Sequence, residues 1–325
     1  MNPSQLTRRR LLGAMALAGL VPSAFGNAYP SKAVRFVSPY GPGGSNDTSA
    51  RILAEVLSRK YGQQVVVENK PGAGTRVASE SVAHAAADGY TLLWAAAPFA
   101  INTGAGLSQR FDIHKDFVAL GPRVLGPVFL IVNANSPVKT VADFVKVAKQ
   151  KPDGVNFASP GIGSGPHLMA ELFASQAGFK VVNVHYRGDA TAYTELLAGR
   201  VDATLTAITT ALPFIQAGKL RVIAVAAEQR TPVYQDAPTF AEQGVPGVVG
   251  YGWFGIVAPA GTPAPIVRQL NQDASQALSD AQVRQKLLAL GLQPAPGSSA
   301  DFAAFIDSEV KKWGTLVRTR GLVLE

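Results

Sequence analysis

The sequence predicts an α/β fold made of two domains. Short apolar runs alternate along the chain with helical periodicity, which is typical of strands joined by crossover helices. Several of these runs are continuously apolar, as in parallel strands that are buried on both faces. Two glycine-rich turns, about 120 residues apart, each join a strand to a helix, and the 325-residue length suits two domains.

The elements are expected in the following order. We predict strands at residues 34–37, 65–67, 91–95, 129–132, 156–158, 181–184, 203–206, 222–225 and 255–257. We predict helices at residues 47–60, 140–151, 166–177, 190–198 and 266–279, with further helical pattern at 266–290 and 301–319. The alternation of strands and helices is interrupted near Gly126 and again near residues 247–250. We therefore assign residues 29–127 and 251–325 to one domain and 128–250 to the other. The chain then crosses between the domains twice, and such a connection favours hinge closure around a ligand.

Residues 1–28 have the pattern of an export signal. Arg8, Arg9 and Arg10 precede an apolar stretch at 11–21, which is too short to span a bilayer comfortably because spanning takes about 20 residues. Residues 7–12 resemble the twin-arginine export pattern, although a Sec-type leader with three arginines would look similar. We therefore expect a periplasmic protein that is soluble after the leader is removed.

Composition excludes several kinds of protein. The formal charge is +8, of which the three leader arginines supply three, leaving +5 scattered along the mature chain. A nucleic-acid-binding protein would usually cluster its basic residues on one face. The chain has no cysteine, so disulfides and thiol catalysis are excluded, and its four histidines lack zinc spacing. We expect no metal, no cofactor and no nucleic-acid partner.

The first glycine-rich loop, residues 38–47, precedes a predicted helix. Gly43 and Gly44 allow close approach of a ligand to the backbone, and the positive helix end attracts an anion. Ser45 or Asn46 is expected to cap the helix. Asp47 either supports the helix end or contacts a cationic group of a ligand. The loop is not a dinucleotide fingerprint, because Asn46 stands where the third glycine would be.

The second glycine-rich loop, residues 159–167, likewise joins a predicted strand to a predicted helix and could bind an anion. Pro166 suits the first helical position, while Ser159, Gly163 and Ser164 offer hydroxyl and backbone donors. His167, in the first helical turn, either donates a hydrogen bond to a ligand or packs on the loop. Gly163 occupies the nucleophile position of the hydrolase elbow, and spacing alone assembles no Ser/His/Asp set, so we expect no enzyme. The two loops together are suited to hold one carboxylate from two sides.

Several stretches of the mature chain resemble a known family when they are taken together. They are Tyr40-Gly-Pro-Gly-Gly-Ser-Asn-Asp47, Val67-Glu-Asn-Lys-Pro-Gly-Ala-Gly74, Asp88-Gly-Tyr-Thr-Leu-Leu93, Ala158-Ser-Pro-Gly-Ile-Gly-Ser164 with His167, Tyr186-Arg-Gly188, Gly218-Lys-Leu-Arg221 and Trp253-Phe-Gly-Ile-Val-Ala-Pro-Ala-Gly-Thr-Pro263. The chain resembles the substrate-binding receptors of tripartite tricarboxylate transporters, the Bug receptors. The resemblance implies a type II periplasmic-binding-protein fold with a ligand cleft between two α/β domains. It also implies a small organic carboxylate ligand, held by Gly43–Asp47 and by Ser159, Gly163, Ser164 and His167, and delivered to a two-subunit membrane permease.

Two departures from the family pattern bear on the ligand. Many relatives carry Phe-Asp-Asn near the cleft where this chain has Leu-Thr-Ala around Thr206, so a carboxylate that could hold a substrate amine is missing. Arg76 and Arg123 stand where relatives have small or neutral residues. We hypothesise that one of them meets a second ligand carboxylate; the alternative is that both are solvated or paired with Asp or Glu.

Aromatic residues near the loops narrow the ligand only slightly. Tyr40, Trp94 and Phe99 would suit an aromatic or long aliphatic acid, while Trp94, Phe99 and Trp253 also fit a core or cleft wall. The sequence therefore predicts a monomeric receptor for a dicarboxylate or an aromatic carboxylate. A ligand sensor that docks on a signalling partner and an exported α/β enzyme are the alternatives.

Overall fold

The computed structural model describes residues 29–186 and 189–324, and the predicted leader at 1–28 lies outside them. Lys32 begins a compact unit that includes the rest of the described chain. In the described ranges, no helix combines the length and the apolar character that a membrane crossing requires.

Five strands and the first part of a sixth form one region of the sheet. β1 (Val34–Ser38) pairs in parallel with β2 (Val65–Asn69) and β3 (Thr91–Ala96). β9 (Tyr251–Pro259) runs antiparallel to β3 and to the first part of β4 (Phe117–Asn133), which also pairs with β10 (Gln293–Ala295). The expected parallel strands are present in β1, β2 and β3, whereas β4 and β9 add antiparallel pairs that the sequence pattern did not indicate.

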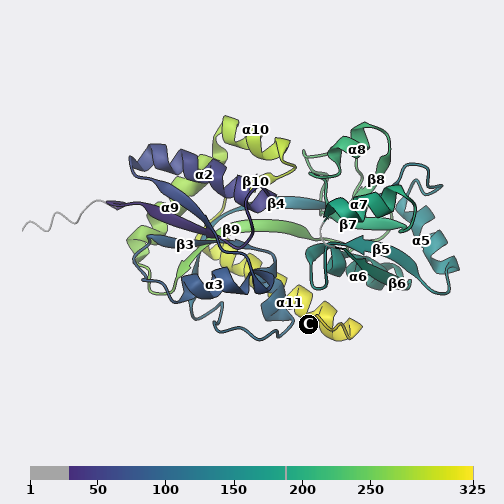
Figure 1. Cartoon of the computed structure of the whole chain (residues 1–325), viewed down its shortest axis with the longest axis horizontal. Helices are drawn as coiled ribbons and strands as arrows, with labels where there is room; N and C mark the ends of the chain where they lie inside the picture. The colour runs from purple at the N-terminus through teal and green to yellow at the C-terminus, as the bar shows by residue number, and fades with distance from the viewer. Residues whose placement is uncertain (1–28, 187–188, 325) are drawn as a thin grey trace, which may run out of the picture. The chain divides into compact units, whose positions relative to one another are not determined.

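The remaining strands form the second region around the other end of β4. β5 (Val155–Ser159) pairs in parallel with β6 (Val181–His185) and β7 (Ala203–Ala207). The second part of β4 pairs antiparallel with β7 and with β8 (Leu220–Val225). Figure 1 shows the long β4 extending through both regions, so one continuous strand connects them.

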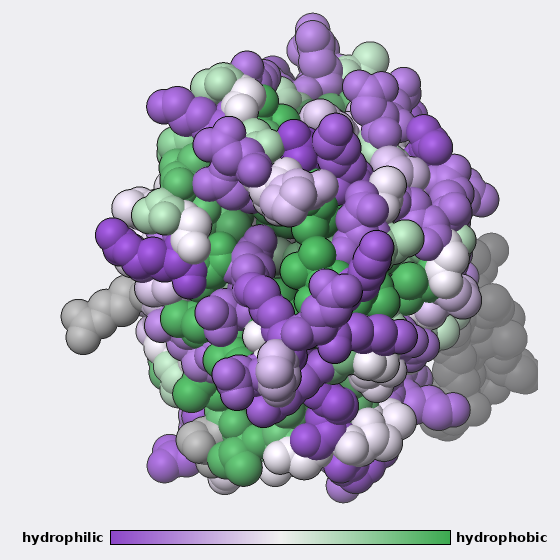
Figure 2. Space-filling model, turned by 90° about the vertical axis from the view of Figure 1, so that its right-hand side faces the viewer, coloured by the Kyte–Doolittle hydropathy of each residue, from purple (hydrophilic) through white to green (hydrophobic). Residues whose placement is uncertain are grey.

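Helices cover both regions of the sheet (Figure 1). α2, α3, α4, α9 and α10 accompany the first region, and α5, α6, α7 and α8 the second. Their bounds are α2 Ser45–Tyr61, the 3-10 turn η2 Ala73–Thr75, α3 Arg76–Ala83, α4 Pro98–Gly104, α5 Val141–Gln150, α6 Gly165–Ala177, α7 Asp189–Leu197, α8 Leu212–Gln216, α9 Ala264–Ser279, α10 Ala281–Ala289 and α11 Ser299–Arg320. Figure 2 views the second region from its outer side, where hydrophilic residues cover most of the surface and hydrophobic ones form small groups.

The last helix, α11, packs against both regions. Phe302 and Ile306 belong to the apolar core of the first region, whereas Trp313, Leu316 and Val317 join the core that includes β5 and α6. Where α11 crosses α4, Gly104 and Gly314 bring the two backbones together, and a Cβ on Gly104 would lie 2.4 Å from the Val310 carbonyl oxygen. The close crossing therefore requires a residue without a side chain.

Each strand and helix predicted individually is present, and apart from the start of β4 the bounds differ by a few residues. The sequence pattern did not indicate the first part of β4, nor β10, α3, α4 and α8. Gly121-Pro122 and Gly126-Pro127 are turn signals inside β4, and the strand accommodates the first pair at an irregularity of register between Ala119 and Arg123.

Candidate functional site

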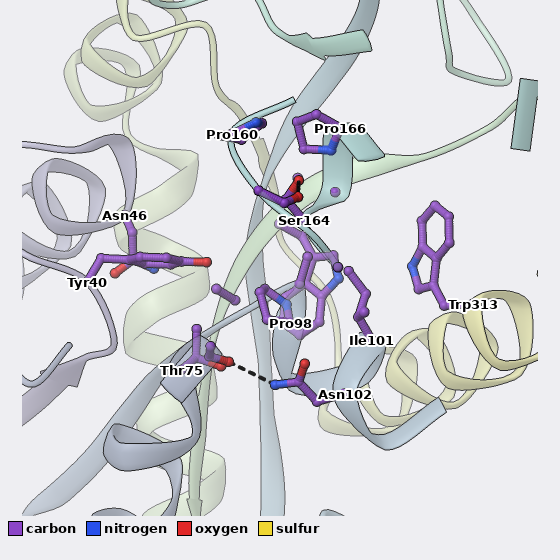
Figure 3. A pocket seen from close by; sticks show the side chains of 18 of the residues that line it. Tyr40, Asn46, Thr75, Pro98, Ile101, Asn102, Pro160, Ser164, Pro166 and Trp313 are labelled. Carbon is purple, nitrogen blue, oxygen red and sulfur yellow. Dashed lines mark hydrogen bonds between the residues drawn. The ribbon is translucent and has the colours of Figure 1, made fainter. Parts of the chain in front are cut away.

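A cavity of about 730 Å³ lies where the first and second glycine-rich loops face each other. Figure 3 shows Tyr40 and Asn46 on one side and Pro160, Ser164 and Pro166 on another, with Thr75, Asn102, Ile101 and Trp313 completing the ring. Of the residues predicted for the site, those that line the cavity are Tyr40, Gly44, Ser45, Asn46, Arg76, Gly163, Ser164 and Thr206. The other four are not part of the lining: Asp47, Ser159 and His167 are buried, and Gly43 is exposed.

The first loop is fixed by Asp47. Its carboxylate accepts hydrogen bonds from the Gly43 N–H at 2.9 Å, from the Arg51 guanidinium at 2.9 to 3.1 Å and from Asn69 Nδ2 at 2.8 Å. The hydrogen-bonded Arg51 is the main reason that the pKa of Asp47 is lowered to about 2. Because the buried carboxylate is fully engaged, its geometry supports the helix-end interpretation rather than contact with a ligand cation.

The cap of α2 differs from the prediction. The helix begins at Ser45, Gly44 is the N-cap, and no side chain makes the capping hydrogen bond. Ser45 and Asn46 are therefore first-turn residues, and expecting either as the cap was wrong. The consequence is that the N–H groups of this first turn have no partner within the helix and lie at its positive end.

Asn46 supplies a side-chain donor at the cavity wall. Its Oδ1 accepts a hydrogen bond from Ser38 Oγ at 2.7 Å, which orients the amide. Its Nδ2 is buried and has no hydrogen-bond partner in the described part of the chain. A buried N–H group without a partner is costly, so a ligand oxygen at this position would satisfy it.

Tyr40 extends from the first loop into the cavity (Figure 3). The residue is 38% exposed and lines the cavity. Burial among the surrounding protein raises the pKa of Tyr40 to about 12, so the phenol remains protonated at neutral pH and can donate a hydrogen bond.

The second loop repeats the construction of the first. The Gly163 N–H donates to Nδ1 of His167, four residues later, at 3.0 Å, as the Gly43 N–H donates to Asp47. Ser164 is the N-cap of α6, and its hydroxyl also donates to the Gly161 carbonyl at 2.6 Å. The N–H groups of Gly43 and Gly163 are thus already hydrogen-bonded within the protein. An anion would therefore meet the helix ends of the two loops rather than these two donors.

His167 is buried beneath the second loop. Burial, with a smaller contribution from His185, lowers the pKa of His167 to about 4, so the ring is neutral at pH 7. Its ring meets that of His185 edge to face, with the centroids 4.8 Å apart. Ser159 Oγ is hydrogen-bonded to His185 Nδ1 at 2.6 Å. His185 was not predicted, although its position at the end of β6, beside the end of β5, indicated proximity to the loop.

A third loop, residues 72–75, contributes to the cavity and was missed by the sequence analysis except for the neighbouring Arg76. Ala73, Gly74, Thr75 and Arg76 line the cavity in succession. Arg76 donates to the carbonyls of Ala73 at 2.9 Å and Ser108 at 3.0 Å. Its guanidinium is therefore held at the cavity by backbone oxygens.

Arg123 lies elsewhere. It stands over the Phe305 ring, with its guanidinium carbon 4.7 Å from the ring centroid, and its charge interacts with Asp301. It does not contribute to the lining of the cavity. Nε and Nη1 of Arg123 are buried without a hydrogen-bond partner among the described residues, so the structure removes Arg123 from the cavity wall without closing a hydrogen bond to an acidic residue.

The strands provide the remaining wall. Thr206 on β7 is buried at the cavity, with Val128 and the residues 251–254 of β9. Trp253 lines the cavity, whereas Trp94 and Phe99 are core residues, Trp94 stacking on Phe36. The structure therefore favours the core interpretation for Trp94 and Phe99. Trp313 and Leu324, from the C-terminal segment, also line it and had no signal in the sequence.

The electrostatics of the cavity favour an anion. Among the described residues that line it, Arg76 is the charged one, and none is Asp or Glu. The two helix ends and Nδ2 of Asn46 add hydrogen-bond donors. Within residues 29–186 and 189–324, no three His, Cys, Asp or Glu side chains come together as a group able to hold a metal ion.

Comparison with known protein sequences gives a consistent result. The family model described as "Tripartite tricarboxylate transporter family receptor" matches residues 49–322. Protein BugT of Bordetella pertussis is 32% identical over 313 residues, which cover 96% of each chain. A UPF0065 protein of Pseudomonas sp. strain P51, from the tcbD-tcbE intergenic region, is 33% identical over 318 residues, covering 97% of this chain and 95% of the relative.

Solved structures agree with the sequence comparison. An R. palustris protein with adipate is 32% identical with a TM-score of 0.78, over 90% of this chain and 98% of that one. MatC from Rhodopseudomonas palustris with bound malate is 32% identical with a TM-score of 0.75, over 89% of this chain and 100% of that one. The periplasmic binding protein BugD is 30% identical with a TM-score of 0.74, over 90% of this chain and 99% of that one.

Proposed function

We propose, because the chain belongs to the tripartite tricarboxylate transporter receptor family, that it captures a small organic carboxylate and delivers it to a two-subunit membrane permease. The expected periplasmic-binding-protein fold is confirmed by the solved relatives. The proposal places the mature protein in the periplasm as a monomer. It assigns the protein a role in binding and transport in which the ligand leaves chemically unchanged.

The observation that supports the carboxylate most directly is the pair of similarly built loops. In each, a glycine N–H is bonded to a buried side chain four residues later, which leaves the first turn of a helix facing the same cavity. A partly buried helix end contributes up to about 2 kcal/mol to anion binding, and each charge-assisted hydrogen bond about 1.5–3 kcal/mol. A few such contacts reach the roughly 8 kcal/mol that micromolar affinity needs.

The ligand is proposed to be a dicarboxylate or an aromatic carboxylate. Much of the cavity wall is apolar, from residues such as Ile101, Met169 and Trp313, and the described lining has no carboxylate for a ligand amine. The relatives solved with adipate and with malate support a carboxylate with a second polar end. Arg76 is our candidate to attract that second end.

Capture is proposed to involve closure of two domains, residues 29–127 with 251–325 and residues 128–250. The switch of β4 partners supports this division, since β9 and β10 pair with its first part and β7 and β8 with its second. Loops at the ends of the two strand sets then approach each other around the ligand.

The test is titration calorimetry on the protein without residues 1–28, using mono- and dicarboxylates, aliphatic and aromatic, with amino acids for comparison. Asn46→Asp places a negative charge at the cavity wall, and we expect carboxylate affinity to fall at least tenfold. Asn135→Asp makes the same charge change at an exposed position away from the cavity and should leave affinity unchanged. If no carboxylate binds the wild-type protein, or Asn46→Asp binds one normally, the proposed grip is wrong.

A further inference from the structure

The third loop has a backbone conformation that a simple turn does not require. Four successive residues, Gly72, Ala73, Gly74 and Thr75, have φ values of 141°, 45°, 59° and 78°. Glycine adopts such angles readily, but for a β-branched residue they are unusual. Strained backbone of this kind is concentrated at ligand clamps and active sites, so Thr75 merits an explanation in terms of its side chain.

Hydrogen bonds from neighbouring segments hold the loop in this conformation. Asn102 Nδ2 on α4 donates to the Gly74 carbonyl at 2.8 Å (Figure 3), and Ser79 Oγ donates to the Thr75 carbonyl at 3.1 Å. The Thr75 N–H donates to the Gly72 carbonyl at 3.0 Å. These contacts use the backbone of the loop and leave the Thr75 hydroxyl with no structural role in the turn.

The Thr75 hydroxyl is buried and unsatisfied. The residue is 4% exposed and lines the cavity, and its Oγ1 has no hydrogen-bond partner among the described residues. Valine would fill the same space without leaving a buried polar atom unpaired. A buried hydroxyl beside an anion-binding cavity is therefore a candidate ligand contact.

The position of Thr75 indicates which part of a ligand it meets. Figure 3 shows Thr75 and Asn102 across the cavity from Pro160, Ser164 and Pro166 of the second loop. A carboxylate held by the glycine-rich loops would thus leave the other end of its molecule near the third loop. The next residue, Arg76, lines the cavity as well and adds a positive charge.

We infer that Thr75 hydrogen-bonds a second oxygen group of the ligand and makes the receptor selective for dicarboxylates over monocarboxylates of equal length. The inference rests on the proposed function, since it takes the first carboxylate to be held by the other two loops. In this arrangement the neutral Thr75 hydroxyl donates a hydrogen bond to the distal carboxylate of the ligand. The positive charge of Arg76 favours an anionic group at the same end of the cavity.

The experiment compares α,ω-dicarboxylates of four to eight carbons with the matching straight-chain monocarboxylates by calorimetry. For the wild-type protein we expect dicarboxylates to bind at least tenfold more tightly. Thr75→Val should weaken dicarboxylate binding about tenfold or more and change monocarboxylate binding less than twofold. Thr75→Ser keeps the hydroxyl and should keep the preference. Thr103→Val removes a hydroxyl of α4 that bonds to the Phe99 carbonyl, and should leave the preference intact.

Thr75→Gly provides a second test, because glycine accepts the positive φ and the variant should fold even if Thr75→Val does not. It lacks the hydroxyl and should also lose the preference. If monocarboxylates bind the wild-type protein as tightly as dicarboxylates, or if both hydroxyl-free variants retain the preference, the inference is wrong while the carboxylate grip stands. If no acid of either series binds, the proposed grip fails and the inference with it.

Discussion

His167 offers a quantitative test of how the second loop is built. In the folded protein its pKa is about 4, because the ring is buried, whereas a histidine in an unfolded chain has a pKa near 6.5. Between these pH values the unfolded chain binds more protons than the folded one, so the free energy of unfolding falls as the pH is lowered through this window. Well above pH 6.5 both states are neutral at this residue, and His167 then adds no pH dependence.

The expected size follows from the shift. A difference of about 2.5 pKa units corresponds to about 3 kcal/mol of unfolding free energy, lost progressively as the pH falls from about 6.5 to 4. His167→Gln cannot be protonated in this range, and its side-chain oxygen can still accept from the Gly163 N–H. The variant should therefore lose less stability on acidification than the wild type. His185, whose pKa is also lowered by burial, contributes a dependence of the same sign that remains in the variant.

The assay is urea denaturation at several pH values from 7.5 to 4.5, followed by tryptophan fluorescence. A wild-type unfolding free energy that stays constant over this range would refute the argument, and so would an equal loss in His167→Gln. Ligand affinity gives an independent check. Because His167 is already neutral, its titration should not affect carboxylate affinity between pH 8 and 6.

Two further predictions concern the first loop and the packing of α11. Asp47→Asn should lower the free energy of unfolding by about 2 kcal/mol at pH 7, because the folded-state pKa of about 2 lies below the usual value for aspartate. The stabilisation by the Asp47 carboxylate is present above about pH 4 and is lost as the pH falls toward 2. The control Asp153→Asn changes an exposed residue and should cost less than about 0.5 kcal/mol. Equal effects of the two substitutions would contradict this account. Gly104→Ala places a methyl group 2.4 Å from the Val310 carbonyl oxygen and should destabilise the protein by about 1–3 kcal/mol. An unchanged melting temperature would show that α11 and α4 can separate at little cost.

Local sequence pattern predicted those elements whose signals are short in range. The buried strands β1, β3 and β5 are continuous apolar runs, and α2 and α6 each follow a glycine-rich turn. Their existence depends on burial and backbone freedom within a few residues. The first part of β4 was missed because its glycines and prolines indicate turns, and its strand conformation depends on pairing with β9, more than 120 residues later.

The same distinction applies to the site. The two glycine-rich loops were recognised because Gly43 with Asp47 and Gly163 with His167 lie within single strand-to-helix turns. The free donor of Asn46, however, depends on Ser38, which fixes the amide orientation across the loop. Sequence could place the residue but not decide which of its atoms remains available.

The amino-acid sequence by itself determined the α/β architecture, the two anion-suited helix ends and the family of the chain, because these depend on local periodicity, turn chemistry and ordered motifs. The tertiary structure alone decided which residues line the cavity. Asp47, His167 and Arg123 are not part of the lining, and the charge of Arg123 interacts with Asp301, whereas Thr75 is part of the lining. These outcomes depend on contacts between segments far apart in the chain, such as Asn102 with Gly74, which no local pattern encodes.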